Sequence, residues 1–365
     1  MIAIIGAGPA GSRAAYFLAK AGYDVKLFED HEKIGEPVQC TGVLTSTVSE
    51  ILPPSKEYFV NEINRIDVIA PDNTNLELKL KSKEYIYDRR KFDSYLANMA
   101  HDAGAEVLTG HRFIDYNSKE MKIKVRHKGE IKEYKVEKLI GADGPSSPVA
   151  KAAGIFGKRE FFIGAQAVVK MKNNPDIYKT YFGSVCPGLF AWAVPEDKNH
   201  VRLGLGDRKN PNVLFQELKK RVGADEIIEW QGGLIPIYNP KLKSQTNDRK
   251  VLLVGDAAGQ VKATTAGGII QGMTAAEIAA KSIIDNFDYE KTWKKTLGKE
   301  LWLHLRIRKI LDKFTDKDYN SLIASMKKEK VRKILETESR DKPMKLLVKL
   351  MVANPSLARF GLKIF

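Results

Sequence analysis

The sequence predicts an α/β fold, and three observations support this prediction. The chain opens with a short apolar run at residues 1–5, followed by glycines in G-x-G-x-x-G spacing and a helical pattern. At about residues 160–240, apolar and polar residues alternate as they do in half-buried strands. After residue 289 the chain is mostly helical and basic. We therefore expect a Rossmann-like domain, an inserted sheet-rich domain and a helical C-terminal region.

The opening strand and its glycines are the most informative part of the chain. A short apolar strand fits a parallel sheet that is buried on both faces. Gly6 and Gly8 would make the tight turn and let the backbone approach a pyrophosphate, and Gly11 would let the helix pack on the strand. A second strand at 24–28 ends at Glu29, where a carboxylate can accept hydrogen bonds from a ribose diol. This order of elements predicts a dinucleotide site.

The remaining elements are predicted from local apolar patterns. Alternating or continuous apolar runs indicate strands, and apolar residues three to four positions apart indicate helices. Two of the runs flank His127-Lys128-Gly129 and predict a hairpin. We expect strands at 65–69, 76–80, 106–108, 121–126, 131–136, 161–171, 181–182, 189–194, 201–205 and 250–254, a strand running into a turn over 139–146, and helices at 92–103 and 266–283.

The composition excludes several classes of protein. No apolar run approaches the roughly 18 to 20 residues that are needed to cross a bilayer. The first strand starts at Met1, which leaves no room for a signal peptide. Cys40 and Cys186 make no disulfide framework, and the six histidines lack metal-ligand spacing. We therefore expect a cytoplasmic protein without a metal site.

The net charge of +15 is concentrated near the C-terminus. Residues 291–365 hold 20 Lys and Arg against 8 Asp and Glu, a net charge of +12. Such a region suggests an anionic partner, either nucleic acid or a phospholipid surface. Because no nucleic-acid recognition motif accompanies the charge, we expect no binding to nucleic acid.

The basic region also contains apolar helical faces. Apolar residues recur there at helical spacing, and basic residues surround them. Such helices either pack on their own domain or lie on anionic lipid at a membrane surface. The first face comprises Leu303, Ile307, Ile310 and Phe314, with Arg306, Arg308, Lys309 and Lys313 around it, and the second comprises Leu346, Leu347, Leu350 and Met351.

Three fingerprints together resemble a group of flavoproteins. They are the glycine motif with its acid, the turn at Asp143 and the strand that ends at Asp256. Over about residues 1–285 the chain is similar to the flavoproteins typified by aromatic hydroxylases. The resemblance implies FAD as the cofactor, with Asp256 on the ribityl chain and the backbone N–H groups of Gly268 and Ile269 at the flavin pyrimidine end. A helix N-terminus there suits the negative charge of reduced flavin.

Within that group the chain resembles the geranylgeranyl reductases of archaeal lipid synthesis. The segment G-E-P-V-Q-C-T-G at 35–42 is similar to the family's loop that bears a cysteine beside the flavin. The segment D-R-R-K-F-D at 88–93 is similar to the family's D-R-x-x-F motif, in which Arg89 would contact the cofactor. The segment P-G-L-F-A-W-A-V-P at 187–195 is similar to the family's YxWxFP segment, which lines the lipid cavity.

The resemblance implies a reductase that saturates isolated C=C bonds of geranylgeranyl chains, such as those of archaeal ether phospholipids. A hydride would leave N5 of reduced FAD, and a proton would reach the other alkene carbon. Cys40 is the candidate proton donor or site organiser, and its alternative role is packing under the flavin. Phe190, Trp192 and Val194 would line a lipid tunnel or, alternatively, belong only to the core. Phe190 replaces the family's usual Tyr and Val194 its usual Phe, so the exact lipid stays open.

The partners and site residues follow from the same resemblance. We expect an isoprenoid lipid substrate and an external electron donor, either NAD(P)H or ferredoxin. We also expect peripheral contact with anionic lipid at the inner face of the cell membrane. The predicted cofactor-binding residues are Gly6, Gly8, Ala10, Gly11, Glu29, Cys40, Thr41, Val43, Arg89, Asp256, Gly268 and Ile269.

The predicted domains are discontinuous in sequence. The FAD-binding domain and the sheet domain alternate along the chain, and the basic helical region follows both. The expected boundaries are 1–60, 84–160 and 245–285 for the FAD-binding domain, 61–83 and 161–244 for the substrate-binding sheet domain, and 286–365 for the C-terminal region.

Two rival functions remain open at this point. A flavin-dependent monooxygenase or halogenase has a similar FAD domain, and residues 190–195 loosely echo the W-x-W-x-I-P segment of halogenases. A lipid- or flavin-binding module without activity is the non-enzyme alternative. The three cofactor motifs disfavour a module of that kind.

Overall fold

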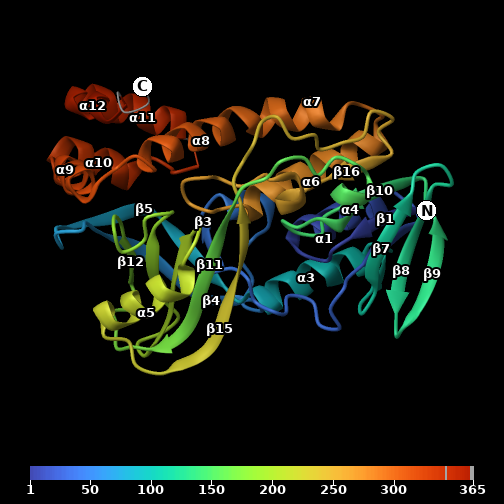
Figure 1. Cartoon of the computed structure of the whole chain (residues 1–365), viewed down its shortest axis with the longest axis horizontal. Coiled ribbons are helices and arrows are strands. Elements are labelled where there is room, and N and C mark those ends of the chain that lie inside the picture. The colour runs from blue at the N-terminus through green and yellow to red at the C-terminus, as the bar shows by residue number, and fades with distance from the viewer. Residues whose placement is uncertain (342, 362–365) are drawn as a thin grey trace.

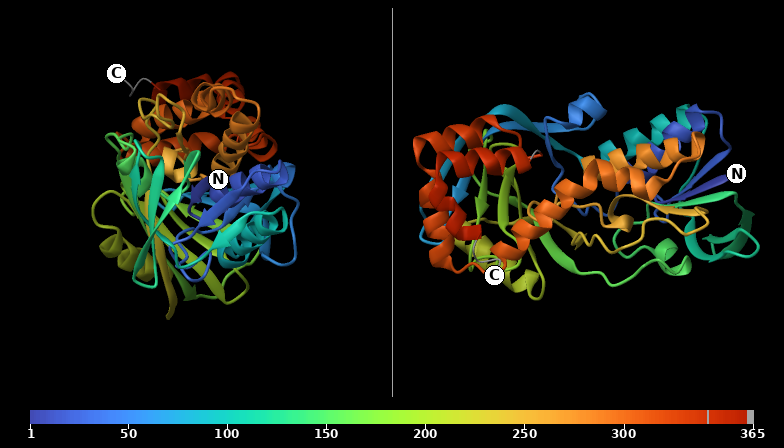
Figure 2. Two further views of the ribbon diagram at one scale, coloured as in Figure 1. Left: turned by 90° about the vertical axis from the view of Figure 1, so that its right-hand side faces the viewer. Right: turned by 90° about the horizontal axis from the view of Figure 1, so that it is seen from above.

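The computed structural model describes residues 1–341 and 343–361, so Lys342 and residues 362–365 of the predicted basic region lie outside the described residues. Figure 1 shows an elongated molecule with the N-terminal strands at one end and a large curved sheet at the other. The C-terminal helices run along one side of both parts, as the view from above in Figure 2 also shows. The α/β fold class predicted from the sequence is confirmed.

A five-stranded parallel sheet forms around the opening strand. Its strands are short and apolar, as expected where helices or other layers cover both faces. Parallel pairing brings the carboxyl ends of the strands to one edge, where the glycine loop begins. In spatial order the strands are β16 (Val251–Leu253), β10 (Lys138–Gly141), β1 (Ile2–Ile5), β2 (Val25–Phe28) and β6 (Glu106–Leu108).

Helices cover one face of this sheet. Helix α1 (Pro9–Lys20) packs against both α3 (Arg89–Asp102) and α6 (Ile269–Ile284). Helix α3 begins three residues earlier than predicted, because the Asp88 carboxylate caps it by accepting two backbone N–H groups of its first turn. This cap places Arg89 at the start of the helix, near the carboxyl edge of the sheet.

A small antiparallel sheet covers the other face of the parallel sheet. Its apolar residues, including Phe113 and Val125, share a core cluster with Ala3 and Phe28. The predicted hairpin around Lys128 is present, whereas the strand that pairs with it at residues 112–117 was not predicted. The strands are β7 (Arg112–Asn117), β8 (Lys122–His127) and β9 (Glu130–Lys135), and the short helix α4 (Pro148–Ala152) packs beside β7.

An eight-stranded sheet forms the other half of the molecule. All neighbouring strands pair antiparallel except β12 and β4, which are parallel. In spatial order the strands are β15 (Ile227–Pro236), β11 (Phe161–Lys170), β14 (His200–Asp207), β13 (Ala191–Pro195), β12 (Ile177–Tyr181), β4 (Phe59–Ile69), β5 (Asn75–Tyr87) and β3 (Val43–Thr45), the last of which precedes the single turn α2 (Val48–Ile51).

The two faces of this sheet have different roles. Small and aliphatic side chains, such as Ala167 and Leu203, pack one face against α5 (Pro211–Val222). The neighbouring residues along the same strands, including Gln166 and Arg202, point to the opposite face. Strand β3 and the end of β5 pair in this sheet, although the predicted boundaries assign both to the FAD-binding domain. Those domain boundaries stay a prediction.

The C-terminal region is helical, as expected. None of the described helices is long and apolar enough to cross a membrane. The elements are α7 (Tyr289–Trp293), a π-helical turn (Lys294–Gly298), α8 (Lys299–Leu311), α9 (Asp316–Met326), α10 (Glu329–Thr337), α11 (Pro343–Ala353), a 3-10 turn (Pro355–Leu357) and α12 (Ala358–Gly361).

Helix α8 packs differently from the sequence-based interpretation. Its buried residues are Leu301, His304 and Arg308, while the apolar face predicted from its pattern is only half-buried. Arg308 is 1% exposed, pairs with Asp312 at 2.7 Å and donates to the Leu189 carbonyl oxygen at 3.3 Å. Arg308, which the sequence placed among the basic residues around the apolar face, is therefore an interior residue of this region.

Candidate functional site

The glycine loop after β1 is shaped to approach a phosphate. Gly6 has φ +99°, and a Cβ there would lie 2.4 Å from the Ala142 carbonyl oxygen, so the tight turn requires glycine. A Cβ on Gly11 would lie 1.9 Å from the Gly6 carbonyl oxygen, so the helix can approach the loop only without a side chain. Gly8 instead borders open space, with nothing within 4 Å of an added Cβ. The backbone at Gly8 is therefore accessible to a pyrophosphate.

The charges around the loop also suit a dinucleotide. Helix α1 starts after Gly8 with no side-chain cap and no acidic residue in its first turn, so its N–H groups can meet an anion. The Glu29 carboxylate at the end of β2 accepts a hydrogen bond from the Ala7 N–H at 2.8 Å. Its other oxygen lies 2.7 Å from His31 Nδ1. These contacts hold Glu29 beside the glycine loop.

A second helix N-terminus lies beside Asp256. Helix α6 begins at Ile269 after Gly268, again with no side-chain cap and no acid in its first turn. Asp256 lies in a single 3-10 turn after β16, and a Cβ on Gly268 would be 3.1 Å from its Oδ1. Burial raises the pKa of Asp256 to about 6, although Arg89 acts in the opposite direction. Within residues 1–341 and 343–361 no group donates a hydrogen bond to this carboxylate, so it can accept one from a ribityl hydroxyl.

Arg89 connects the cofactor residues to the cysteine loop. Its guanidinium makes a two-pronged ion pair with Asp93, with Nε–Oδ1 at 2.9 Å and Nη2–Oδ2 at 2.7 Å. Burial acts to lower the pKa of Arg89, but Asp93 and Cys40 raise it above its ordinary value. Arg89 therefore lies close to both Cys40 and Asp256. The structure thus brings these three predicted residues together.

The loop that bears Cys40 is held by an arginine that sequence reasoning missed. Cys40 is half-buried, and its Sγ accepts the Gly42 N–H at 3.4 Å. The buried Arg202 donates hydrogen bonds from its Nη1 to two carbonyl oxygens. One is that of Thr41, and the other is that of Tyr87, at 2.9 Å. One guanidinium therefore ties the loop to the end of β5. The signal in the sequence was a charged residue among the apolar residues of β14.

One of the predicted wall residues, Trp192, lies next to the cysteine loop. The Trp192 Nε1–H donates to Gln166 Oε1 at 2.8 Å, and the Thr41 hydroxyl donates to the same oxygen. The indole lies over Gly204, where a Cβ would be 2.7 Å from the ring, and the Phe190 ring centre is 5.6 Å from that of Trp192. Gln166 was not predicted, although a polar residue in an apolar strand was visible in the sequence.

The other predicted residues are packed in the interior. Val194 is buried in an apolar cluster with Ile86, and Val43 pairs with Ile86 and packs on the same cluster. Ala10 lies in the first turn of α1, with its methyl group 3.1 Å from a Cβ built on Gly255. These contacts describe packing, so the roles predicted for these three residues stay predictions.

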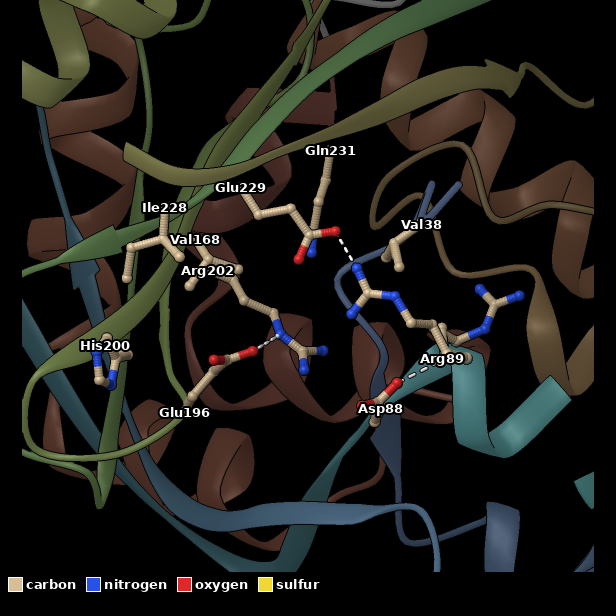
Figure 3. A pocket seen from close by; sticks show the side chains of 11 residues that line it. Val38, Asp88, Arg89, Val168, Glu196, His200, Arg202, Ile228, Glu229 and Gln231 are labelled. Atoms are coloured by element: carbon tan, nitrogen blue, oxygen red, sulfur yellow. Dashed lines mark hydrogen bonds and ion pairs between the residues drawn. The ribbon is translucent and has the colours of Figure 1, made fainter. Parts of the chain in front are cut away.

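A polar pocket of about 310 Å³ lies beside the cysteine loop (Figure 3). Its lining includes Arg89 but none of the three predicted wall residues. Three arginines line it, and each is paired with a carboxylate: Arg89 with Asp93, Arg90 with Glu229, and Arg202 with Glu196, the last pair being labelled in Figure 3. Because these charges are paired, the pocket has little attraction for an anion. It is distinct from the predicted apolar tunnel.

The chain is similar to known proteins over nearly its whole length. Residues 1–177 match the family model described as FAD binding domain. A digeranylgeranylglycerophospholipid reductase of Methanothrix thermoacetophila is 31% identical, and the match covers 91% of this chain and 93% of that protein. A geranylgeranyl bacteriochlorophyll reductase-like protein of Thermoplasma acidophilum has a TM-score of 0.86 at 22% identity, covering 100% of this chain and 98% of the other. A flavin-dependent brominase has a TM-score of 0.73 at 16% identity, covering 99% of each chain.

These similarities differ in what they establish. The two solved structures share the fold alone, because their identities with this chain are low. The family model confirms FAD as the cofactor, and the uncapped helix ends and the open space beside Gly8 fit it. With a reductase relative at 31% identity, the chain is an FAD-dependent oxidoreductase. It belongs to the digeranylgeranylglycerophospholipid reductase family.

Proposed function

We propose that the protein reduces isolated C=C bonds in the geranylgeranyl chains of archaeal ether phospholipids. Its family membership supports this reaction class. The observation that carries the proposal is the shared acceptor Gln166 Oε1, which joins Thr41 of the cysteine loop to Trp192 of the predicted lipid wall. An alkene lying against Trp192 would thereby be held beside the flavin.

The protein contributes to this reaction by orienting the alkene and by excluding water. When bound, reduced FAD supplies a hydride to one alkene carbon, and a proton is added to the other carbon. An isolated alkene has no carbonyl group to polarise, so orientation and exclusion of water must supply much of the rate. Phe190, Trp192 and Val194 suit that role, because residues two positions apart project from the same side of a strand, and Trp192 and Val194 are buried while Phe190 is half-buried. Arg89 and Asp256 hold the cofactor.

We assign Cys40 the role of proton donor or site organiser. Arg89 lies close enough to its sulfur to interact with it, and the Gly42 N–H also points at Sγ. The Arg89 guanidinium and the Gly42 N–H thus hold the sulfur in place, as either role requires. The alternative is that Cys40 packs under the flavin and water donates the proton.

Product analysis without oxygen tests the proposal. The FAD-loaded protein, reduced with dithionite, is incubated with a digeranylgeranylglycerol phosphate lipid, and the lipid is analysed by mass spectrometry. We expect a gain of two hydrogen atoms for each saturated bond. Unchanged lipid would contradict the proposal, and an oxygenated or halogenated product in air with halide would favour the rival functions. NAD(P)H and reduced ferredoxin, compared in the same assay, would identify the electron donor.

We also propose that the protein acts at the inner face of the cell membrane. Helix α11 exposes an apolar face made of Met344, Val348, Met351 and Val352, and Val352 is 78% exposed. These residues lie on one side of the helix, and lysines lie among them in the sequence. Together with the net charge of +12 over residues 291–365, this face suits an anionic lipid surface.

Vesicle sedimentation tests this membrane contact. Replacing the four residues of the α11 apolar face with serine should reduce binding to anionic vesicles and leave FAD content unchanged. Binding of the parent protein should fall with added salt, because each basic residue near such a surface contributes about 1 kcal/mol. The matched control replaces two exposed apolar residues of the sheet domain, Val213 and Ile228, with serine. Equal binding by all three proteins, or none, would contradict the proposal.

A further inference from the structure

A buried ion pair joins the cofactor domain to the C-terminal region. Lys262 Nζ lies 2.6 Å from Asp341 Oδ1, and each side chain is 10% exposed. Lys262 belongs to the segment between β16 and α6, and Asp341 belongs to the loop between α10 and α11. The two residues are 79 positions apart in the chain, so no local sequence pattern could predict their contact.

Asp341 is held in its ionised form. Its Oδ2 accepts hydrogen bonds from the hydroxyls of Thr45 and Thr47, the latter at 2.9 Å. Burial would raise the pKa of Asp341, but Lys262 and the two threonines lower it to about 2. Asp341 is therefore a fixed negative charge at neutral pH, and it holds the Lys262 ammonium in one place.

Lys262 lies against the start of α6. Its backbone N–H donates to the Gly267 carbonyl oxygen at 3.0 Å, and a Cβ on Gly267 would be 3.3 Å from Lys262 Nζ. Gly267 precedes Gly268, which is the N-cap of α6 and lies beside Asp256. The lysine charge thus adds to the positive end of the helix dipole at this point. Both fields favour negative charge on a group bound there.

His304 belongs to the same polar cluster and adds no charge to it. It is 4% exposed, and its Nδ1 shares a hydrogen bond with the Thr264 hydroxyl. Burial lowers the pKa of His304 to about 4, and Lys262 adds to the effect. His304 is therefore neutral at pH 7, and Lys262 supplies the positive charge of the cluster.

We propose that Lys262, held by Asp341, is a positioning residue that raises the reduction potential of bound FAD by stabilising negative charge on the reduced flavin. This inference rests on the FAD site and not on the identity of the lipid. Because Asp341 lies in the C-terminal region, the potential of the cofactor depends on that region staying docked. Displacement of the loop would leave the lysine charge uncompensated and raise the potential further.

The test is the reduction potential of FAD in the purified full-length protein, measured by spectroelectrochemistry at pH 7. Lys262→Met should lower the potential, because reduced flavin loses a nearby positive charge. Lys262→Arg should keep the potential close to that of the parent. Asp341→Asn should raise it, and the double variant Lys262→Met with Asp341→Asn should return toward the parent. Loosened structure would shift both single variants in the same direction.

A surface ion pair provides the matched control. Lys345 pairs with Glu338 at 3.0 Å with a lysine side chain that is 59% exposed, so Lys345→Met should leave the potential unchanged. An unchanged potential in Lys262→Met, or shifts of the same sign in Lys262→Met and Asp341→Asn, would overturn the proposal. If Lys262→Met does not retain FAD, the Asp341→Asn variant tests the proposal alone. A reduction potential of Asp341→Asn equal to that of the parent would then overturn the proposal.

Discussion

Replacing Gly8 with alanine should separate cofactor binding from folding. Gly8 has φ −69° and ψ −179°, a conformation that alanine adopts without strain. An added Cβ meets nothing within 4 Å. Placing alanine at a helix N-cap in place of glycine costs about 1 kcal/mol or less. We therefore expect the free energy of unfolding of Gly8→Ala to stay within about 1 kcal/mol of the parent.

The affinity for FAD should fall much further. The new methyl group would project into the space that the pyrophosphate must use to reach the N–H groups at the start of α1. Loss of one charge-assisted hydrogen bond costs about 1.5–3 kcal/mol. This loss corresponds to a dissociation constant about 10- to 150-fold larger.

Two measurements check this prediction. Fluorescence titration of the apoprotein with FAD gives the affinity, and urea denaturation of the apoprotein gives the stability. Gly11→Ala is the matched control, because its Cβ would lie 1.9 Å from the Gly6 carbonyl oxygen and should destabilise the fold itself. If Gly8→Ala bound FAD as tightly as the parent, the pyrophosphate would not cross this loop and the reasoning would be refuted.

Three further predictions concern Glu29, Cys40 and Asp341. Glu29→Ala should weaken FAD binding by about 1.5–3 kcal/mol through the lost ribose contacts, and an unchanged affinity in calorimetric titration would reject that contact. Cys40→Ser should retain FAD but lower turnover by about a hundred- to ten-thousand-fold, whereas normal turnover in Cys40→Ala would assign Cys40 to packing. The pKa of Asp341 is about 2 in the folded protein against 3.8 ordinarily, so its contribution to stability is present above about pH 4 and is lost as the pH falls toward 2. The stability gap between the parent and Asp341→Asn should therefore shrink by about 1 kcal/mol between pH 7 and pH 3 in urea denaturation, and a constant gap would contradict this sign.

The sequence was most informative where the cause of structure is local. Gly6, Gly11 and Glu29 are spaced by the geometry of one strand, one turn and one helix, and the structure has each in the expected element. The hairpin at Lys128 follows from its turn residues in the same way. The cap made by Asp88 was also local, but the helix was predicted from apolar spacing alone and its start was placed too late.

The contacts that hold the site together were not predicted. Arg202 reaches Thr41 across 161 positions, and Lys262 reaches Asp341 across 79. Local hydrophobicity contains no information about such pairs, because each residue meets its partner only after the sheets and the C-terminal region have assembled. The burial of Arg308 could not be predicted for the same reason, since one of its partners is the backbone of Leu189.

Reoxidation of the bound flavin by lipid is the direct test of the proposed reduction. The protein is loaded with FAD, reduced with one equivalent of dithionite and mixed with the geranylgeranyl lipid in a stopped-flow instrument without oxygen. We predict that the absorbance of oxidised flavin returns on adding lipid, with one alkene bond lost for each flavin reoxidised. A fully saturated lipid of the same headgroup should leave the flavin reduced. Flavin that stays reduced with the unsaturated lipid, or that reoxidises equally with the saturated one, would show that the protein does not reduce these double bonds.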